Sequence, residues 1–337
     1  MCYDLIGVKM KKRIRLLVHI FLLILVLFLG FYELPYYIDA PGGLDNLNNK
    51  VEVENAYKAK GSINLTYVRE IKATPLMSII ALINPNWKIE PKKNPDNGNL
   101  DYDEMMLRQK ILMRQSYTSA IKYAYEAAEK EVNVESEKCY VIYKYNEAKT
   151  SLKVGDQITS IDGNKIDKCS DIREYINNKE VGDKSTIRVI YNDKEYERNA
   201  TYISVNDTKL IGVQLATEYV LSTNPKYKFK FSSSEYGPSG GLMVTLAVYN
   251  SLTEKDITGG KKIAGTGTIE ADGSVGEIGG IEYKIIGAAS KKADIFFVPS
   301  GENYEDAKKV IEKHHYKMKL VEVKSFDDAL NYLLNNN

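Results

Sequence analysis

The sequence predicts an α+β protein with a single N-terminal transmembrane helix and a compact β-rich unit in its middle. Three observations support this fold class. An uncharged run of 17 residues, 16–32, directly follows a basic cluster. Residues 134–205 show the short alternating segments and turn dipeptides that are typical of strands. Residues 206–337 alternate strand-like and helix-like segments, as mixed domains do.

The composition excludes several classes of protein. With 44% hydrophobic and 27% charged residues, the chain is not globally disordered. Its net charge of +1 gives no reason to expect nucleic-acid binding. The three cysteines, Cys2, Cys139 and Cys169, are too few and too scattered for a disulfide framework or a metal cage. We expect free thiols; the alternative, in an oxidising compartment, is a Cys139–Cys169 bridge.

The N-terminal apolar run is predicted to be an uncleaved membrane anchor over residues 16–33. Its 17 residues are near the lower limit for a spanning helix, since about 20 are typical. A buried core helix would carry a polar stripe, and a cleaved signal peptide would end in an A-x-A site. The basic cluster "KKRIR" should remain in the cytoplasm, which places the rest of the chain outside the cell. Met10, just before this cluster, is an alternative start.

Between the anchor and the β-rich unit, the sequence predicts one strand and one long helix. "ELPYYIDAPGG" at 33–43 has two prolines and two glycines, so we expect an irregular exit from the membrane. Residues 62–71 alternate as a strand does, and 85–99 are punctuated as a loop. A helix capped by Asp101 or Asp103 should reach about Lys130.

The remaining elements follow from periodicity and from turn dipeptides. In the β-rich unit, "VGD" and "IDG" mark turns within 152–166, and Asn192-Asp193 joins two strands. We also expect a strand at 139–143 and a short helix at 171–178. For the last part of the chain, we expect helices at 239–252, 282–293, 304–314 and 326–334, and strands at 262–269, 295–298 and 319–323.

Nucleotide, metal and histidine chemistry find no support in the sequence. No segment matches the G-x-x-x-x-G-K-[ST] P-loop, and the glycine-rich segments 259–267 and 273–280 fit turns better than phosphate loops. There are only three histidines and no H-E-x-x-H motif. We therefore expect no cofactor, no metal and no Ser-His-Asp triad.

"YGPSGGLM", residues 236–243, raises the possibility of a serine nucleophile. Ser239 stands between a Gly-Pro turn and a glycine pair, directly before a predicted helix. On one interpretation Ser239 is the helix N-cap, and the glycines allow a close approach to a sheet. On the other, Ser239 attacks a carbonyl and the backbone N–H groups beside it stabilise an oxyanion. The residues alone leave both open.

"GEIGGIEYKIIGAA" contains a candidate general base. Lys284 falls in the first turn of a predicted helix among apolar neighbours. Burial lowers a lysine pKa from about 10.4, and a helix N-terminus also disfavours the added proton. The alternative is a lysine on a solvated helix face, as we expect for Lys291 and Lys292.

Together, the two motifs resemble the proteolytic domain of Lon proteases. That family has G-P-S-A-G and then, about 40 residues on, T-G-x-I-x-x-x-G-x-V-x-x-I-G-G-x-x-x-K. The resemblance implies that Ser239 is the nucleophile, that Lys284, 45 positions later, is the base, and that Thr266 orients its amine. Gly240 replaces the usual alanine and is a candidate backbone donor to the oxyanion. Tyr236 replaces the acidic residue of many Lons, so no acidic helper is assigned.

A second resemblance concerns the β-rich unit, where "LKVGDQITSIDGNKI" is similar to PDZ domains. The carboxylate-binding loop would lie just before residue 139, but "SEKCY" is not glycine-rich, so we do not expect capture of a C-terminal carboxylate. The order of anchor, "LPYYIDAPGG", "KGSINLTYV", "ATPL", PDZ and Lon-like segments resembles the membrane-anchored, PDZ-containing Lon-like proteases of Gram-positive bacteria. These include pheromone-processing serine proteases.

The resemblance implies an ATP-independent serine endopeptidase that cleaves secreted peptides or extracytoplasmic protein segments, without nucleotide or cofactor. It leaves a homo-oligomer open. The alternative functions are a non-catalytic PDZ adaptor on a degenerate Lon-like scaffold, or an intracellular protein with a buried N-terminal helix.

The predicted segments are a cytoplasmic basic N-terminus at 1–15, a transmembrane anchor at 16–33, the first part of the Lon-like catalytic domain at 44–132, the PDZ domain at 134–205, and the second part of the catalytic domain, with the Ser/Lys dyad, at 206–337.

Overall fold

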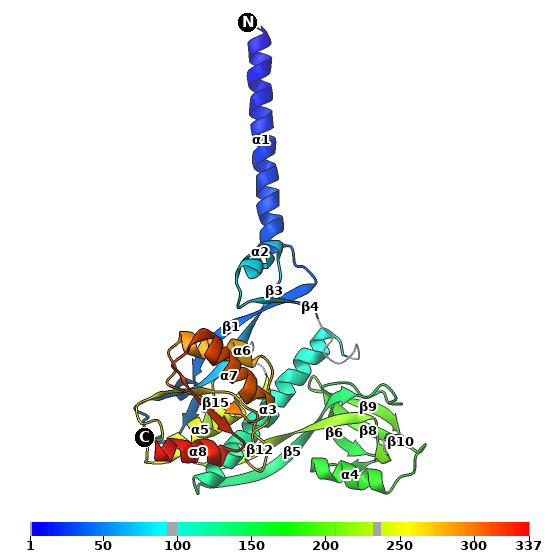
Figure 1. The fold of residues 1–337 in the computed structure, drawn as a ribbon. Coiled ribbons are helices and arrows are strands. Elements are labelled where there is room, and N and C mark those ends of the chain that lie inside the picture. The colour runs from blue at the N-terminus through cyan, green and yellow to red at the C-terminus, as the bar shows by residue number, and fades with distance from the viewer. Residues whose placement is uncertain (1, 93–99, 206, 232–236, 337) are drawn as a thin grey trace. The chain divides into compact units, whose positions relative to one another are not determined.

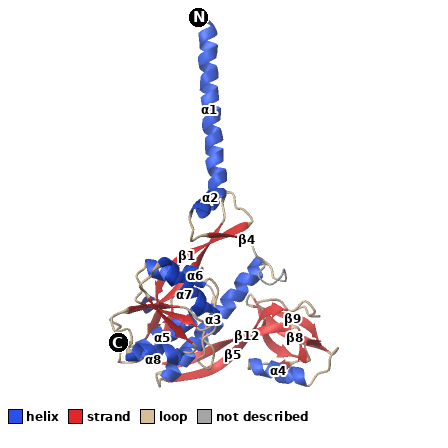
Figure 2. Cartoon of the chain, viewed as in Figure 1, coloured by secondary structure: helices blue, strands red, loops and turns tan. Residues whose placement is uncertain are grey.

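The computed structural model of the chain describes residues 2–92, 100–205, 207–231 and 237–336 (Figure 1). The chain forms two compact units, one of residues 1–42 and 68–93, the other of residues 43–67 and 94–337. Helices and strands are mixed throughout (Figure 2), which confirms the predicted α+β class.

The first unit contains the long helix α1, Cys2–Phe31. Its segment Arg13–Phe31 is long and apolar enough to cross a membrane, and none of that segment is buried. The structure therefore does not support a buried core helix. This unit also contains a short helix, α2 at Pro75–Ile83, and a strand, β4 at Lys88–Pro91.

Two strands of the first unit correct the sequence-based expectation. The segment expected to be irregular forms β1, Tyr36–Asn46, and β4 lies within the segment expected to be a loop. Residues 36–39 pair antiparallel with residues 88–91. A proline is tolerated in a strand where its missing N–H is not needed for pairing, so Pro41 does not end β1. The rest of the expected loop, 93–99, lies outside the described residues.

The second unit has four parallel neighbouring strands, β3, β14, β15 and β16. Successive residues of β15 point to opposite faces. Ile295 and Phe297 join a cluster with residues of α3, α5 and α8, whereas Phe296 and Val298 join one with residues of α6 and α7. Both faces are thus covered by helices. The bounds are β3 Ser62–Lys72, β14 Lys262–Gly265, β15 Ile295–Pro299, β16 Lys319–Val323, α5 Gly241–Leu252, α6 Ile281–Ser290, α7 Glu302–His314 and α8 Phe326–Asn335.

The long helix α3, Tyr102–Ala127, begins at the expected cap. The Asp101 side chain accepts a hydrogen bond from the Glu104 N–H, and the Glu104 carboxylate accepts one from the Asp101 N–H. This reciprocal pair satisfies two backbone donors that a helix start would leave open. Buried residues such as Ile121 and Ala124 place one face of α3 in the same core cluster as α5.

The β-rich unit forms a sheet with the order β12-β5-β6-β8-β9, in which β7 pairs with β6. Asn192 and Asp193 both have positive φ, as a two-residue hairpin turn requires. Strand β5 is far longer than the expected 139–143, because the unpredicted β12 pairs along its whole length. The bounds are β5 Glu131–Lys144, β6 Gln157–Ile161, β7 Asn164–Lys165, α4 Cys169–Asn177, β8 Lys184–Tyr191, β9 Lys194–Thr201 and β12 Val213–Asn224.

Cys139 and Cys169 form a disulfide, so the expectation of free thiols was wrong and the alternative holds. Cys139 lies in β5 and Cys169 begins α4. The helix folds back over the strand and brings the two Cα atoms to 5.4 Å, within the range that a disulfide spans. Residues 30 positions apart meet only because of this tertiary contact.

Candidate active site

Ser239 lies in a short 3-10 helix, η2, Pro238–Gly240, that leads directly into α5. It is half-buried. The N-cap of α5 is Gly240 rather than Ser239, which corrects the N-cap interpretation and leaves the serine hydroxyl unused in capping. Tyr236 lies outside the described residues.

Close packing requires glycine at position 241 and favours it at position 240. A Cβ at Gly241 would lie 2.4 Å from Ser116 Oγ and 2.8 Å from the backbone nitrogen of Ile269. A Cβ at Gly240 would lie 3.0 Å from Tyr117 Oη, which gives a physical reason for glycine in place of alanine. The start of α5 therefore packs closely against α3.

Two backbone hydrogen bonds and one from a side chain fix the Ser239 turn to the end of β14. The Ser239 carbonyl accepts from the Gly267 N–H at 2.8 Å and from Thr266 Oγ1 at 3.0 Å. The Leu242 N–H donates to the Gly267 carbonyl at 3.1 Å. Strand β14 ends at Gly265, earlier than expected, because the next two residues bind this turn.

Lys284 lies in the first turn of α6, which starts after Gly280 in a left-handed conformation with φ 69°. Its side chain is only 4% exposed. Burial lowers the pKa of Lys284 from 10.5 to about 7. The amine therefore loses its proton near neutral pH, and the alternative of a solvated lysine does not hold.

Thr266 connects Lys284 to Ser239. Lys284 Nζ donates to Thr266 Oγ1 at 3.1 Å, and Thr266 Oγ1 donates to the Ser239 carbonyl. Among the described residues, the Ser239 hydroxyl has no hydrogen bond of its own, so the link to Lys284 runs through Thr266 and the Ser239 backbone. Catalytic hydrogen bonds are often unformed before substrate binds. Gly240 directly follows Ser239 in η2 and is buried.

Helix α3 supplies contacts that sequence reasoning missed. Ser116 Oγ donates to the Pro238 carbonyl at 2.9 Å. On the same helix, Arg114 pairs with Glu218 at 2.8 Å, and Thr118 Oγ1 accepts from the Tyr219 N–H at 3.3 Å. α3 thus contacts both η2 and β12. No local signal points to these residues, because their partners lie about 100 or more positions away in the sequence.

A groove of about 1240 Å³ lies between α4 and the strands β11, Thr208–Leu210, and β12. It is lined by α4 residues such as Arg173 and Glu174, by β11, and by β12 residues such as Leu215 and Thr217. Strand β12 pairs with β5 and is the terminal strand of its sheet. The residues just before Cys139 belong to β5, not to a loop.

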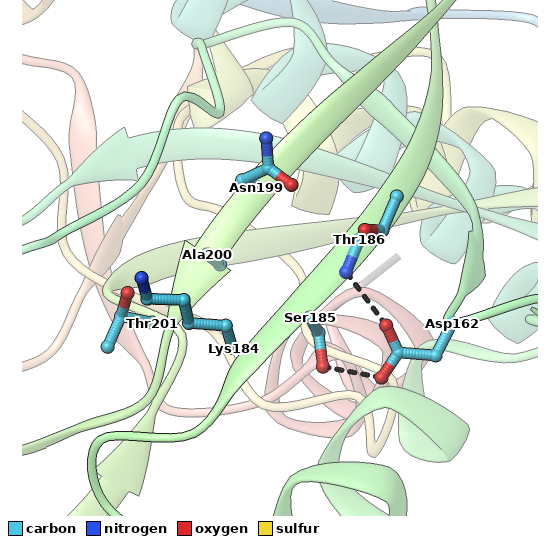
Figure 3. A pocket seen from close by; sticks show the side chains of 7 residues that line it. All are labelled: Asp162, Lys184, Ser185, Thr186, Asn199, Ala200 and Thr201. Atoms are coloured by element: carbon cyan, nitrogen blue, oxygen red, sulfur yellow. Dashed lines mark hydrogen bonds between the residues drawn. The ribbon is translucent and has the colours of Figure 1, made fainter.

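Asp162 lines a smaller pocket of about 360 Å³ together with residues of β8 and β9 (Figure 3). Burial alone would raise the pKa of Asp162, but hydrogen bonds from the Thr186 N–H, Ser185, Tyr175 and Lys179 lower it to about 2. These donors satisfy the carboxylate, so it has a structural role in joining β8 to the turn after β6.

Comparisons with known proteins agree with the two motifs. Residues 232–336 match the Lon protease (S16) C-terminal proteolytic domain, and residues 126–201 match the PDZ domain. A Lon protease from Campylobacter jejuni is 35% identical over 101 residues, which are 29% of this chain and 12% of the relative. One from Fusobacterium nucleatum is 34% identical over 93 residues, 28% of this chain and again 12% of the relative.

The match therefore spans about an eighth of those Lon proteases. Among solved structures, the PDZ domain of an SdrC-like protein from Listeria monocytogenes is 29% identical, over 23% of this chain and 85% of that chain, with a TM-score of 0.21. Residues 232–336 are similar to the proteolytic domain of a serine peptidase family, and residues 126–201 are similar to PDZ domains.

Proposed function

We propose that the protein is an ATP-independent, membrane-anchored serine endopeptidase in which Ser239 is the nucleophile and Lys284 the general base. The observation that supports this most is the environment of Lys284. The amine is buried, has a pKa lowered to about 7, and is hydrogen bonded to the threonine that also holds the Ser239 carbonyl. A surface lysine would have none of these properties.

In the proposed reaction, Ser239 Oγ attacks the peptide carbonyl carbon while neutral Lys284 accepts the hydroxyl proton. Thr266 orients the amine, and the Gly240 N–H donates to the developing oxyanion. The ammonium group then protonates the leaving amine as the peptide C–N bond breaks. Water, deprotonated by Lys284, finally hydrolyses the acyl-enzyme.

The proposed location is a cell membrane, with α1 as a single span, the N-terminus in the cytoplasm and the catalytic part outside. The basic residues before the apolar segment favour this orientation. The Cys139–Cys169 disulfide suits an oxidising compartment and not the cytoplasm. Substrates would then be secreted peptides or extracytoplasmic protein segments.

In the proposed domain organisation, residues 44–132 and 206–337 form one catalytic domain that the PDZ domain at 134–205 interrupts. Strand β3 pairs with β14, and α3 binds η2, which supports a role for the first part beside the second. Because β12 occupies the edge of β5, we place an incoming substrate strand on the outer edge of β12, in the groove beside α4.

The test is cleavage of an unbiased peptide library by the full chain, with products identified by mass spectrometry. We expect Ser239→Ala and Lys284→Ala to abolish cleavage while circular dichroism remains unchanged. Lys291→Ala, an exposed lysine of the same segment, is the matched control and should cleave normally. Cleavage by both site variants at the wild-type rate would exclude the dyad. An adaptor function would leave peptide binding as the only activity of the wild type.

A further inference from the structure

Helix α2 exposes an apolar surface that nothing in the catalytic proposal uses. Its sequence, "PLMSIIALI", contains no charged residue. Leu82 is 80% exposed and Ile83 78% exposed. Leu76, Ile79 and Ile80 are also exposed. Single exposed apolar residues are normal on a protein surface, whereas a contiguous apolar surface marks an interaction site. This nine-residue helix exposes five large aliphatic side chains and is therefore not adapted to water.

The opposite side of α2 packs on the first unit, so the helix has a fixed orientation. Ala81 is buried in a cluster with Ile38 and Ala73, and Met77 and Trp87 pack against that cluster. Thr74 caps the helix by accepting from the Met77 N–H. The exposed surface is therefore a stable face of a folded element.

Hydrogen bonds place the start of α2 at the end of α1. The Leu34 N–H donates to the Ala73 carbonyl at 2.8 Å, and the Ala73 N–H donates to the Tyr36 carbonyl at 3.0 Å. Leu34 is only three residues beyond the last residue of α1, and Ala73 immediately precedes the cap of α2. Both helices belong to the same compact unit, and Figure 1 shows α2 beside the end of α1.

The length of the apolar segment locates this junction relative to a bilayer. The 19 residues Arg13–Phe31 rise about 28 Å as a helix, close to the roughly 30 Å of a hydrocarbon core. Phe31 therefore lies at the far boundary of the core, and Leu34 and Ala73 lie at the interface. Tyr32, Tyr36 and Trp87 supply the aromatic side chains that favour this depth.

We propose that α2 is a second membrane element, an interfacial helix whose Leu76, Ile79, Ile80, Leu82 and Ile83 side chains contact the acyl chains of the leaflet from which α1 emerges. This inference rests on the membrane anchoring in the proposed function. Continuity with the apolar surface of α1 selects lipid over a protein partner as the occupant. Two contacts would hold the first unit against the membrane, where a single span would leave it free to tilt.

The test uses spin labels on the full chain in vesicles of phosphatidylglycerol and phosphatidylcholine. In a Cys2→Ser background, single cysteines replace Leu82 in α2, Leu22 in α1, and the exposed Lys308 in α7. Collisions with oxygen report lipid, and collisions with a water-soluble nickel complex report water. We expect the label at position 82 to behave as the one at 22 does, with frequent oxygen and rare nickel collisions, opposite to position 308.

The possible outcomes distinguish the proposal for α2 from the proposal that α1 spans the membrane. Lipid exposure at 22 with nickel exposure at 82 overturns the α2 proposal alone. Protection from both reagents at 82 means that protein covers the helix, which also overturns it. Nickel exposure at 22 rejects the span itself and the inference with it. Trp87, the chain's only tryptophan, gives a check without substitution in α2, because lipids brominated near the headgroup should quench its fluorescence.

Discussion

A lysine that is 4% exposed holds its proton weakly, and this governs how the proposed reaction depends on pH. With the pKa of Lys284 lowered to about 7, only the deprotonated amine can accept the Ser239 proton. We expect kcat/KM to fall about tenfold per pH unit below pH 7 and to level above it. Thr266→Ser, which keeps the hydroxyl, should retain the profile. A flat profile from about pH 5 to about pH 9 would contradict the role of Lys284.

The same burial affects stability with a definite sign. Between its folded pKa of about 7 and its unfolded value of 10.5, Lys284 binds more protons in the unfolded chain. The free energy of unfolding therefore rises with pH between these two pKa values. Below the folded pKa, the burial of the Lys284 amine lowers the free energy of unfolding by its full amount. Lys284→Met should stabilise the protein most at or below pH 7, and the gain should shrink by about 1.4 kcal/mol per pH unit above.

Urea unfolding of the full chain at several pH values measures this difference. Lys291→Met, at an exposed position near the end of α6, is the control and should show no such trend. Parallel pH curves for wild type and Lys284→Met would mean that the buried amine keeps its ordinary pKa.

At the scale of elements, α3 holds the catalytic turn in place. Ser116→Ala removes one of the two hydrogen bonds to the Pro238 carbonyl, which still accepts from the Gly241 N–H, at a cost of about 0.5–1.5 kcal/mol. We expect kcat to fall roughly tenfold with little change in KM, since the loss affects the position of Ser239 and not substrate binding. Ser119→Ala, also buried on α3, is the matched control because its hydroxyl does not bind η2. Equal losses in the two variants would point to general destabilisation.

The elements also show what sequence can and cannot predict here. The Asp101 cap, the helix α8 and the strand β16 depend on local signals, and each lies where periodicity and capping residues predict. Strand β12 was missed because its formation depends on pairing with β5, up to about 90 positions away. The sequence left the Cys139–Cys169 bridge only as the alternative to free thiols for the same reason, since only the fold of α4 over β5 brings the thiols together.

The candidate site also has parts that the sequence predicts and parts that depend on the tertiary structure. Ser239, Thr266 and Lys284 were predicted from motifs whose resemblance to a known family supplied what local patterns left open. The burial of Lys284 and the contact of Ser116 with η2 could not be predicted, because both depend on side chains from distant segments. The spacing of a motif identifies which groups could react, whereas their pKa values and orientation depend on the tertiary structure.

At the scale of the whole molecule, three residues of α3, Arg114, Ser116 and Thr118, join the groove strand β12 to the catalytic turn. Arg114 pairs with Glu218 of β12, and Ser116 binds Pro238. We expect Arg114→Gln to reduce kcat/KM several-fold for long substrates that reach the groove, and to leave short peptides unaffected. Comparison of peptides of increasing length measures this. Equal losses for short and long peptides would show that Arg114 serves stability only.

This double attachment of α3 has a thermodynamic consequence. If filling the groove shifts α3 and thereby favours acylation of Ser239, then acylation must tighten binding in the groove by the same factor, because coupling free energies are reciprocal. A long peptide would then be held most firmly while its severed end is still bound to the serine. Retention of the acylated fragment in the groove would follow from the contacts of α3 with both elements.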